Sequence, residues 1–176
     1  KLMSCNNVNT TGSTTPSSAE IDFYLAVAKG DFTNYSNVSK FGINSTVGSG
    51  GFESIWEGSN AYPWPTDVQT LSVVSGSAND ASGGTGARTV EIQGLDTNWD
   101  VVTETITMNG VTPVVTTQTF RRVFRAKVVT AGSLKSNADE ITITGSTDSN
   151  ILAYISYDTI GMGQTLMAVY TIPNGK

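Results

Sequence analysis

The stretch of sequence that decides the fold is GLDTNWDVVTETITMNGVTPVVT, residues 94–116. Within it, VVTETITM alternates apolar and polar residues, which is the period of a half-buried β-strand. Asn109 and Gly110 follow, and this dipeptide is the strongest short hairpin signal, because a type I′ turn needs positive φ at both positions. We therefore expect a hairpin centred on residues 108–111. Pro113 cannot donate to a ladder, so the strand after the turn should be an edge strand or carry a bulge.

Similar β-rich runs fill the rest of the chain from Asp67 onward. Gly, Asn, Asp and Ser separate them at the spacing expected of a sandwich or barrel. The runs are residues 68–76, 87–95, 101–108, 111–118, 120–129, 140–145, 151–158 and 165–173. We predict an all-β domain over residues 66–176, an antiparallel sandwich or jelly roll.

The final run, TLMAVYTIP, is apolar on both faces of a strand, since Leu166 and Ala168 oppose Met167 and Val169. A strand of this kind needs a covering layer or a subunit interface. The sequence then stops at Pro-Asn-Gly-Lys. Because a sheet seldom ends on its strongest strand, we expect the polypeptide to continue beyond Lys176.

Residues 1–65 are predicted to form an N-terminal arm followed by long loops. Residues 1–19 are rich in Asn, Ser and Thr, and residues 31–65 have glycines that break any period. Between them, residues 21–28 alternate, which favours a strand or an extended arm. A short helix, capped by Ser17 and Glu20 and ended by Gly30, is the alternative. Long loops usually contact another surface, so we expect this part to reach a neighbouring subunit or another partner.

The composition excludes several classes of function. The chain has no histidine and one cysteine, Cys5, which removes the commonest general base and metal ligand, cysteine zinc clusters and an internal disulfide. A net charge of −5 argues against a general nucleic-acid binder. No apolar run reaches 18 residues, so no segment is expected to span a membrane. We expect no enzymatic activity, no metal and no cofactor.

Acidic residues and glycines offer only weak alternatives to this view. Asp96 and Asp100 flank Trp99 as acids do in many glycoside sites, but an Asx-turn at Asp96 with Trp99 packed on the sheet is the favoured interpretation. Asp80, Asp96 and Asp100 could bind calcium through their oxygens, but their spacing is not that of an EF-hand loop. Residues 82–88, SGGTGAR, lack the Gly-Lys-Ser/Thr ending of a phosphate loop and are predicted to connect two strands.

Two groups of residues are candidate interface residues. Arg121, Arg122, Arg125 and Lys127 bring four of the ten basic residues into seven positions. On a regular strand Arg122 shares a face with Phe120 and Phe124, and the other three basic residues point the opposite way. A solvated or subunit-contacting face is favoured over a nucleic-acid groove.

The second group is Trp56, Tyr62 and Trp64, in a loop with two prolines. Rigid aromatic residues in a loop serve protein interfaces and sugar-binding platforms. They also serve as lids over one end of a core. Contact with a partner and packing within the chain are equally favoured here, and sugar binding comes third.

Five blocks in order resemble a family of virion structural proteins encoded by tailed phages, many of them marine, with some relatives in large algal viruses. The blocks are DFYLAVAKGDFTNYSNVSKFG, IWEGSNAYPWPT, SGSANDASGGTGARTVEIQGLDTNW, ETITMNGVTPV and GQTLMAVYTIPNGK. The resemblance runs from about Asp22 to the end. It implies a non-enzymatic, β-rich component on the virion surface, either a capsid decoration protein or a fibre-like part. It carries over no catalytic or binding residue.

Taken with the doubly apolar strands, the resemblance leads us to expect a homo-oligomer that decorates or cements a bacteriophage capsid. The partners would be other copies of the chain, the major capsid protein or other virion proteins. A trimer is expected by analogy with proteins at local three-fold positions. The alternative is a carbohydrate-binding or adhesin-type module of a viral fibre, with Trp56, Tyr62 and Trp64 as its platform.

Overall fold

The computed structural model describes residues 23–33, 35, 37–58, 60–157 and 163–175. The described residues fall into two compact units, one ending at Ser39 and the other comprising Lys40–Gly175. The sequence-based boundary was at residues 65 and 66. The predicted arm, residues 1–19, and the capping residues Ser17 and Glu20 lie outside the described residues.

The first unit contains the helix α1, Phe23–Lys29. The prediction of a strand or extended arm is therefore wrong for the described part of residues 21–28. Gly30, with φ of +81°, ends the helix, and its amide donates to the carbonyl oxygen of Val27 at 3.0 Å. The helix brings Ala26 and Val27 against Phe32 in a small buried cluster. Packing against Phe32 stabilises the helix. The alternating pattern would stabilise a strand only if a partner strand were paired with it.

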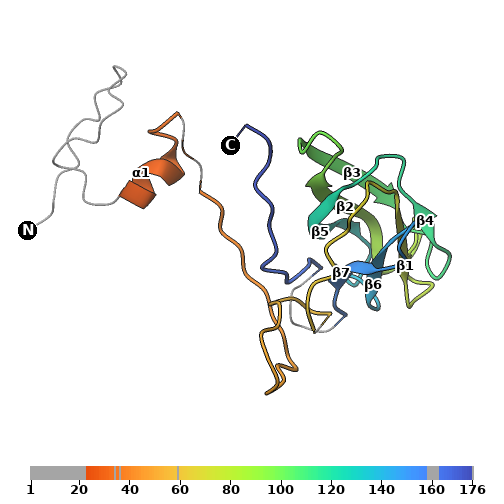
Figure 1. Ribbon diagram of the computed structural model, residues 1–176. Coiled ribbons are helices and arrows are strands. Elements are labelled where there is room, and N and C mark those ends of the chain that lie inside the picture. The colour runs from red at the N-terminus through yellow and green to blue at the C-terminus, as the bar shows by residue number, and fades with distance from the viewer. Residues whose placement is uncertain (1–22, 34, 36, 59, 158–162, 176) are drawn as a thin grey trace, which may run out of the picture. The chain divides into compact units, whose positions relative to one another are not determined.

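The second unit is a sandwich of two antiparallel sheets (Figure 1). One sheet has four strands in the order β4-β1-β6-β7, and the other has three in the order β3-β2-β5. The strands are β1, Leu71–Ser75; β2, Ala87–Leu95; β3, Val101–Thr107; β4, Val114–Val115; β5, Arg122–Ala131; β6, Ile141–Gly145; and β7, Ile151–Ile155. The predicted all-β class is confirmed.

The hairpin predicted at residues 108–111 is wrong. β3 pairs with β2, whereas β4 pairs with β1 in the other sheet, so these residues carry the chain from one sheet to the other. Gly110 has φ of +62°, but Asn109 is not among the residues with positive φ, so the turn is not type I′. Instead, the Gly110 amide donates to the Asp80 carbonyl oxygen at 2.7 Å. The two-residue β4 is an edge strand, as Pro113 predicted.

The core lies between the two sheets. Alternate side chains of β1 and β6 are buried, in the burial pattern that the period-2 sequence predicts. Asn137 closes one end, and its side-chain amide donates to the carbonyl oxygens of Asp139, Ile155 and Ser156. The largest fully buried side chains are Phe120, Leu71, Ile92, Leu95, Met108, Ile141, Ile143, Leu152, Ile155, Val73, Val90 and Val123.

The run at residues 165–173 is extended but is not a strand, so the eighth predicted strand is wrong. It touches β5 through an isolated bridge between Gln164 and Lys127. Beyond that point, backbone hydrogen bonds tie it to loop residues, including Ile43 with Leu166 and Ala168 with Ile55. Met167 and Val169 fill the core, while the opposite face is half open. The covering layer is therefore irregular backbone, which alternation cannot predict.

Candidate binding surface

The β2–β3 hairpin turn, residues 96–100, places the side chain of Trp99 at one end of the three-stranded sheet. The carboxylate of Asp96 accepts the amides of Asn98 at 2.8 Å and Asp100 at 3.0 Å, which is the predicted Asx-turn. Trp99 takes φ of +66° within this turn. The Asp96 carboxylate is thus engaged in holding the backbone, and the turn is a support for Trp99.

Two adjacent arginines lie against the indole ring of Trp99. The guanidinium carbons of Arg121 and Arg122 are 5.1 and 5.2 Å from its centroid. The guanidinium of Arg122 also lies 5.6 Å from the ring of Trp64, so it contacts two indoles. These are cation–π distances. We call Trp64, Trp99, Arg121 and Arg122 the Trp–Arg surface.

The Trp–Arg surface contains donors that the described residues leave unsatisfied. Arg122 Nη1 donates to the carbonyl oxygens of Pro65 and Arg121. The Nε atoms of Arg121 and Arg122 are both shielded from water without a hydrogen-bond partner among the described residues. Burial lowers the pKa of Arg122 below its ordinary value, and the charge of Arg121 lowers it further. The two cations repel one another, and no described carboxylate forms an ion pair with either of them.

The other two basic residues of the predicted cluster are already paired. Lys127 Nζ lies 3.0 Å from the Glu91 carboxylate on β2, where hydrogen bonds from Lys127 and then Gln93 lower the pKa of Glu91. Arg125 donates to Gln164 Oε1 at 3.0 Å. The four basic residues therefore form two separate groups.

The predicted sharing of a face by Phe120, Arg122 and Phe124 is wrong because β5 carries a bulge. Gln93 pairs with Arg125 and Gly94 with Val123, so Phe124 has no partner in β2. Phe120 is in the core, while the Phe124 ring packs on Tyr170 at 5.2 Å. Gly94 permits the bulge, because a Cβ there would lie 2.0 Å from the Arg122 carbonyl oxygen.

The candidate aromatic residues separate into two that are buried and one that is not. Trp56 and Tyr62 belong to the main core cluster, with ring centroids 5.1 Å apart. The Tyr62 hydroxyl lies 3.1 Å from the Leu152 carbonyl oxygen of β7 and 3.3 Å from that of Val123 in β5. Its burial raises the pKa of Tyr62. Packing within the chain therefore accounts for both, and only Trp64, half exposed, is open to a ligand.

Asp80, one of the weak calcium candidates, is a structural carboxylate. It is fully buried and accepts the amides of Ala87 and Ala138, at 2.6 and 2.8 Å, together with the Ser75 hydroxyl at 2.6 Å. Protein donors therefore occupy both of its oxygens. No group of three His, Cys, Asp or Glu side chains able to hold a metal ion occurs in the described part of the chain.

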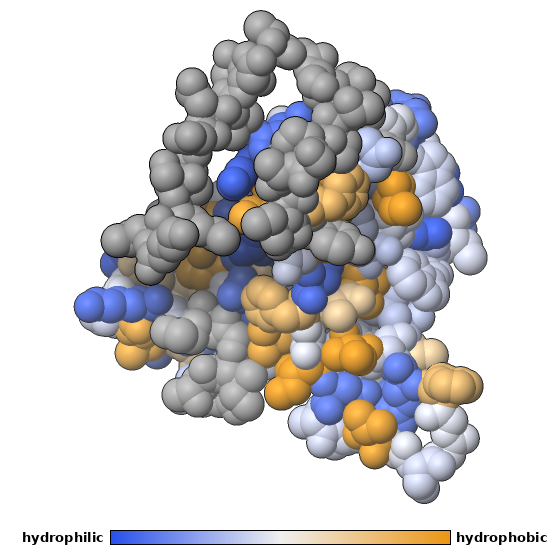
Figure 2. All heavy atoms as spheres, turned by 90° about the vertical axis from the view of Figure 1, so that its left-hand side faces the viewer, coloured by the Kyte–Doolittle hydropathy of each residue, from blue (hydrophilic) through white to orange (hydrophobic). Residues whose placement is uncertain are grey.

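A hydrogen-bonded loop in residues 44–54 presents apolar side chains to solvent. Asn44 donates to Glu53 Oε2 at 2.9 Å, and the Gly48 amide donates to Glu53 Oε1 at 2.9 Å. Val47 and Phe52 project from this frame, Val47 being 69% exposed and Phe52 fully exposed. We call residues 44–54 the apolar loop. It extends to the bottom of Figure 1, and Figure 2 shows apolar side chains on the surface at that end.

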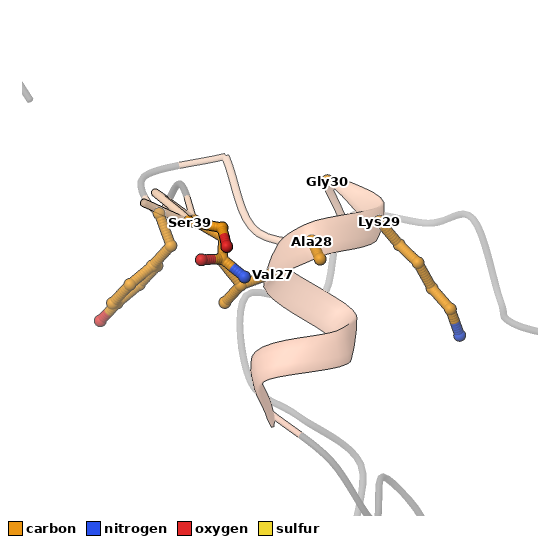
Figure 3. Close-up of a pocket in the computed structure, with 7 residues that line it drawn as sticks. Val27, Ala28, Lys29, Gly30 and Ser39 are labelled. Atoms are coloured by element: carbon orange, nitrogen blue, oxygen red, sulfur yellow. The ribbon is translucent and has the colours of Figure 1, made fainter. Parts of the chain in front are cut away.

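A hollow of about 550 Å³ lies in the first unit, beside α1 (Figure 3). Val27, Ala28, Gly30 and Ser39 lie around it with Tyr35 and Asn37, and the side chain of Lys29 extends away from the labelled residues. Its single charged residue and one short helix do not constitute a catalytic arrangement.

Sequence reasoning identified Trp64 and the two arginines but missed Trp99, the ring that both arginines contact. The signal was available, because antiparallel pairing of residues 87–95 with 120–129 brings the turn after Leu95 beside the start of the arginine run. Comparison of the chain with protein-family models, curated proteins and solved structures finds no match. Within the described residues, no helix is long and apolar enough to cross a membrane.

Proposed function

We propose that the protein is a non-enzymatic structural protein of a virus particle, which decorates or cements the capsid shell as a homo-oligomer. The class comes from the resemblance of five sequence blocks to virion structural proteins. The observation that carries the proposal is the apolar loop, whose fully exposed Phe52 stands on a hydrogen-bonded frame. A framed loop with an apolar tip is suited to insertion into a neighbouring surface.

The energetics favour association through this loop. Burying one phenylalanine side chain contributes roughly 1.5–3 kcal/mol, and Val47 adds a smaller amount. Phe41 and Ile55, which flank the loop in sequence, are both more than half exposed and are available for the same contact. Because Glu53 and Asn44 already hold the loop, little conformational entropy is lost on binding.

The partners in this proposal are other copies of the chain and the major capsid protein or another virion protein. A closed symmetric assembly, with a trimer expected by analogy with shell-decorating proteins, places each loop against a neighbour. The protein would then lie on the virion surface.

The carbohydrate-binding alternative loses support in its original form. Its platform needed three exposed aromatic side chains, and Trp56 and Tyr62 are only 4% and 3% exposed. They cannot meet a sugar while the core is intact. The shell function therefore has the stronger support.

Sedimentation velocity over a range of concentrations tests this proposal. We expect the wild-type chain to form a discrete oligomer, and Phe52→Ser and Val47→Ser to shift it towards the 18.5 kDa monomer. Val111→Ser is the matched control for Val47→Ser, since Val111 is 59% exposed but lies outside the loop. A wild-type chain that is monomeric at every concentration would overturn the proposal. Equal effects of Val111→Ser and Val47→Ser would also overturn it.

A further inference from the structure

We propose that the Trp–Arg surface binds an acidic saccharide, that is, a sugar carrying carboxylate or sulfate groups. The inference goes beyond the proposed structural role and does not depend on it. It rests on four side chains from three segments that the fold brings together.

The first step concerns charge. The chain has a net charge of −5, yet Arg121 and Arg122 lie side by side, and neither forms an ion pair among the described residues. Arg121 also donates no hydrogen bond through its guanidinium in the part of the chain that the structure describes. An isolated pair of cations is unfavourable without an anion, so the surface favours an anionic group.

The second step concerns geometry. Arg122 is held between contacts to Trp64 and Trp99, and Arg121 rests on Trp99. This stacking fixes the guanidinium planes before a ligand arrives. The two terminal nitrogens of the Arg121 guanidinium present parallel N–H donors that match a carboxylate or sulfate, while Arg122 Nη1 already donates to carbonyl oxygens. Fixing a guanidinium reduces the entropy lost on binding.

The third step concerns the sugar. Trp64 is 50% exposed between Pro63 and Pro65, and its ring is supported edge-on by Tyr62 at 5.0 Å. A rigid indole with an open portion suits the flat apolar face of a pyranose ring. An acidic side chain of a protein would need the arginines but not the indole. The combination therefore favours a saccharide over an acidic peptide.

The fourth step concerns rigidity. Trp99 sits in a turn held by the Asp96 carboxylate, and the Asn174 amide donates to the Trp99 carbonyl oxygen at 2.8 Å. The Arg121 amide donates to the Leu95 carbonyl oxygen at 2.7 Å, which fixes the arginines beside that turn. The surface is thus preorganised by backbone contacts of its own unit.

The test is titration calorimetry of the full chain at low salt with four probes. These are an oligogalacturonate, a sulfated dextran oligosaccharide, a neutral dextran oligosaccharide and poly-glutamate. We expect binding of at least one acidic oligosaccharide and none of neutral dextran. The oligosaccharide that binds more tightly tells carboxylate from sulfate.

Variants locate the site. Loss of one charge-assisted contact or one stacking contact weakens binding by roughly tenfold, so Arg121→Gln and Trp64→Ala should each do so. Arg125→Gln is the matched control, because Arg125 lies on the same strand but donates to Gln164. A cooperative urea transition that begins above the conditions of the titration establishes that each variant is folded. Three outcomes would overturn the proposal: no binding of either acidic oligosaccharide at millimolar concentration, equal binding of poly-glutamate, or an equal effect of Arg125→Gln.

Discussion

Replacing Asp80 by alanine should remove the most connected polar contact of the sandwich. The side chain is fully buried, and its oxygens accept the amides of Ala87, Ala138 and Asp139 at 2.6, 2.8 and 3.2 Å and the Ser75 hydroxyl at 2.6 Å. These donors come from three segments: the end of β1, the start of β2 and the approach to β6. Asp80 therefore links both sheets at one end of the core.

The magnitude follows from the donors left behind. Each buried donor without a partner costs about 1–3 kcal/mol, and water entering the vacated space offsets part of this cost. Because three backbone amides would lose their acceptor, we expect Asp80→Ala to lower the free energy of unfolding by about 3–5 kcal/mol. A typical domain has only about 5–15 kcal/mol in total, so the variant should be close to unfolding. Asp80→Asn keeps one acceptor oxygen, so its free energy of unfolding should lie between those of the wild type and Asp80→Ala.

Urea unfolding followed by tryptophan fluorescence measures this change. Asp67→Ala makes the same chemical change at an exposed site, where the carboxylate accepts a hydrogen bond from the Thr66 hydroxyl. This variant should alter stability by less than about 0.5 kcal/mol. If Asp80→Ala also lost less than about 1 kcal/mol, the reasoning that this carboxylate satisfies buried backbone amides would be refuted.

Three further outcomes are expected. Burial, and then neighbouring carboxylates, raise the pKa of Glu140, so its ionised form destabilises the fold. Glu140→Gln should therefore raise the urea midpoint at pH 7 but not at pH 3.5, where both the glutamate and the glutamine side chains are neutral. An equal gain at the two pH values would contradict this. Gly94→Val would force a side chain into the space of the Arg122 carbonyl oxygen, so thermal unfolding should occur several degrees lower; an unchanged midpoint would refute the close approach. Trp56→Ala should cost about 3–5 kcal/mol in urea unfolding, against less than about 1 for half-exposed Trp64→Ala, and similar costs would show that Trp56 is not in the core.

The fold class could be predicted from the sequence, but the route of the chain could not. Period-2 alternation depends only on which face is buried, and the runs it predicted include every strand of the described residues. It does not say which strand is the partner. Asn109 and Gly110 carry a hairpin signal, yet the chain uses them to cross between sheets because residues 109 and 110 pair with the segment after β1. The local preference was outweighed by contacts distant in sequence.

The candidate site was predicted in part for the same reason. Trp64, Arg121 and Arg122 were identified by residue type. The position of Trp99, which contacts both arginines, is set by the β2–β5 register and its bulge. The apolar loop was predicted only as part of the long loops of residues 31–65, which were expected to contact a partner. Its frame depends on the Glu53 carboxylate, which accepts hydrogen bonds from the Asn44 side chain and the Gly48 amide, and no periodicity reveals these bonds.

Hydroxyl-radical footprinting at low and high protein concentration tests the central claim, that the chain associates through the apolar loop. The method reports the solvent accessibility of individual side chains. Phe52 is fully exposed in the single chain, so its modification rate should be high in dilute solution and fall severalfold when the oligomer forms. Trp64, which lies outside the loop, should keep its rate. If Phe52 were modified equally at both concentrations while the protein was demonstrably oligomeric, the loop would not be the interface and the account would be contradicted.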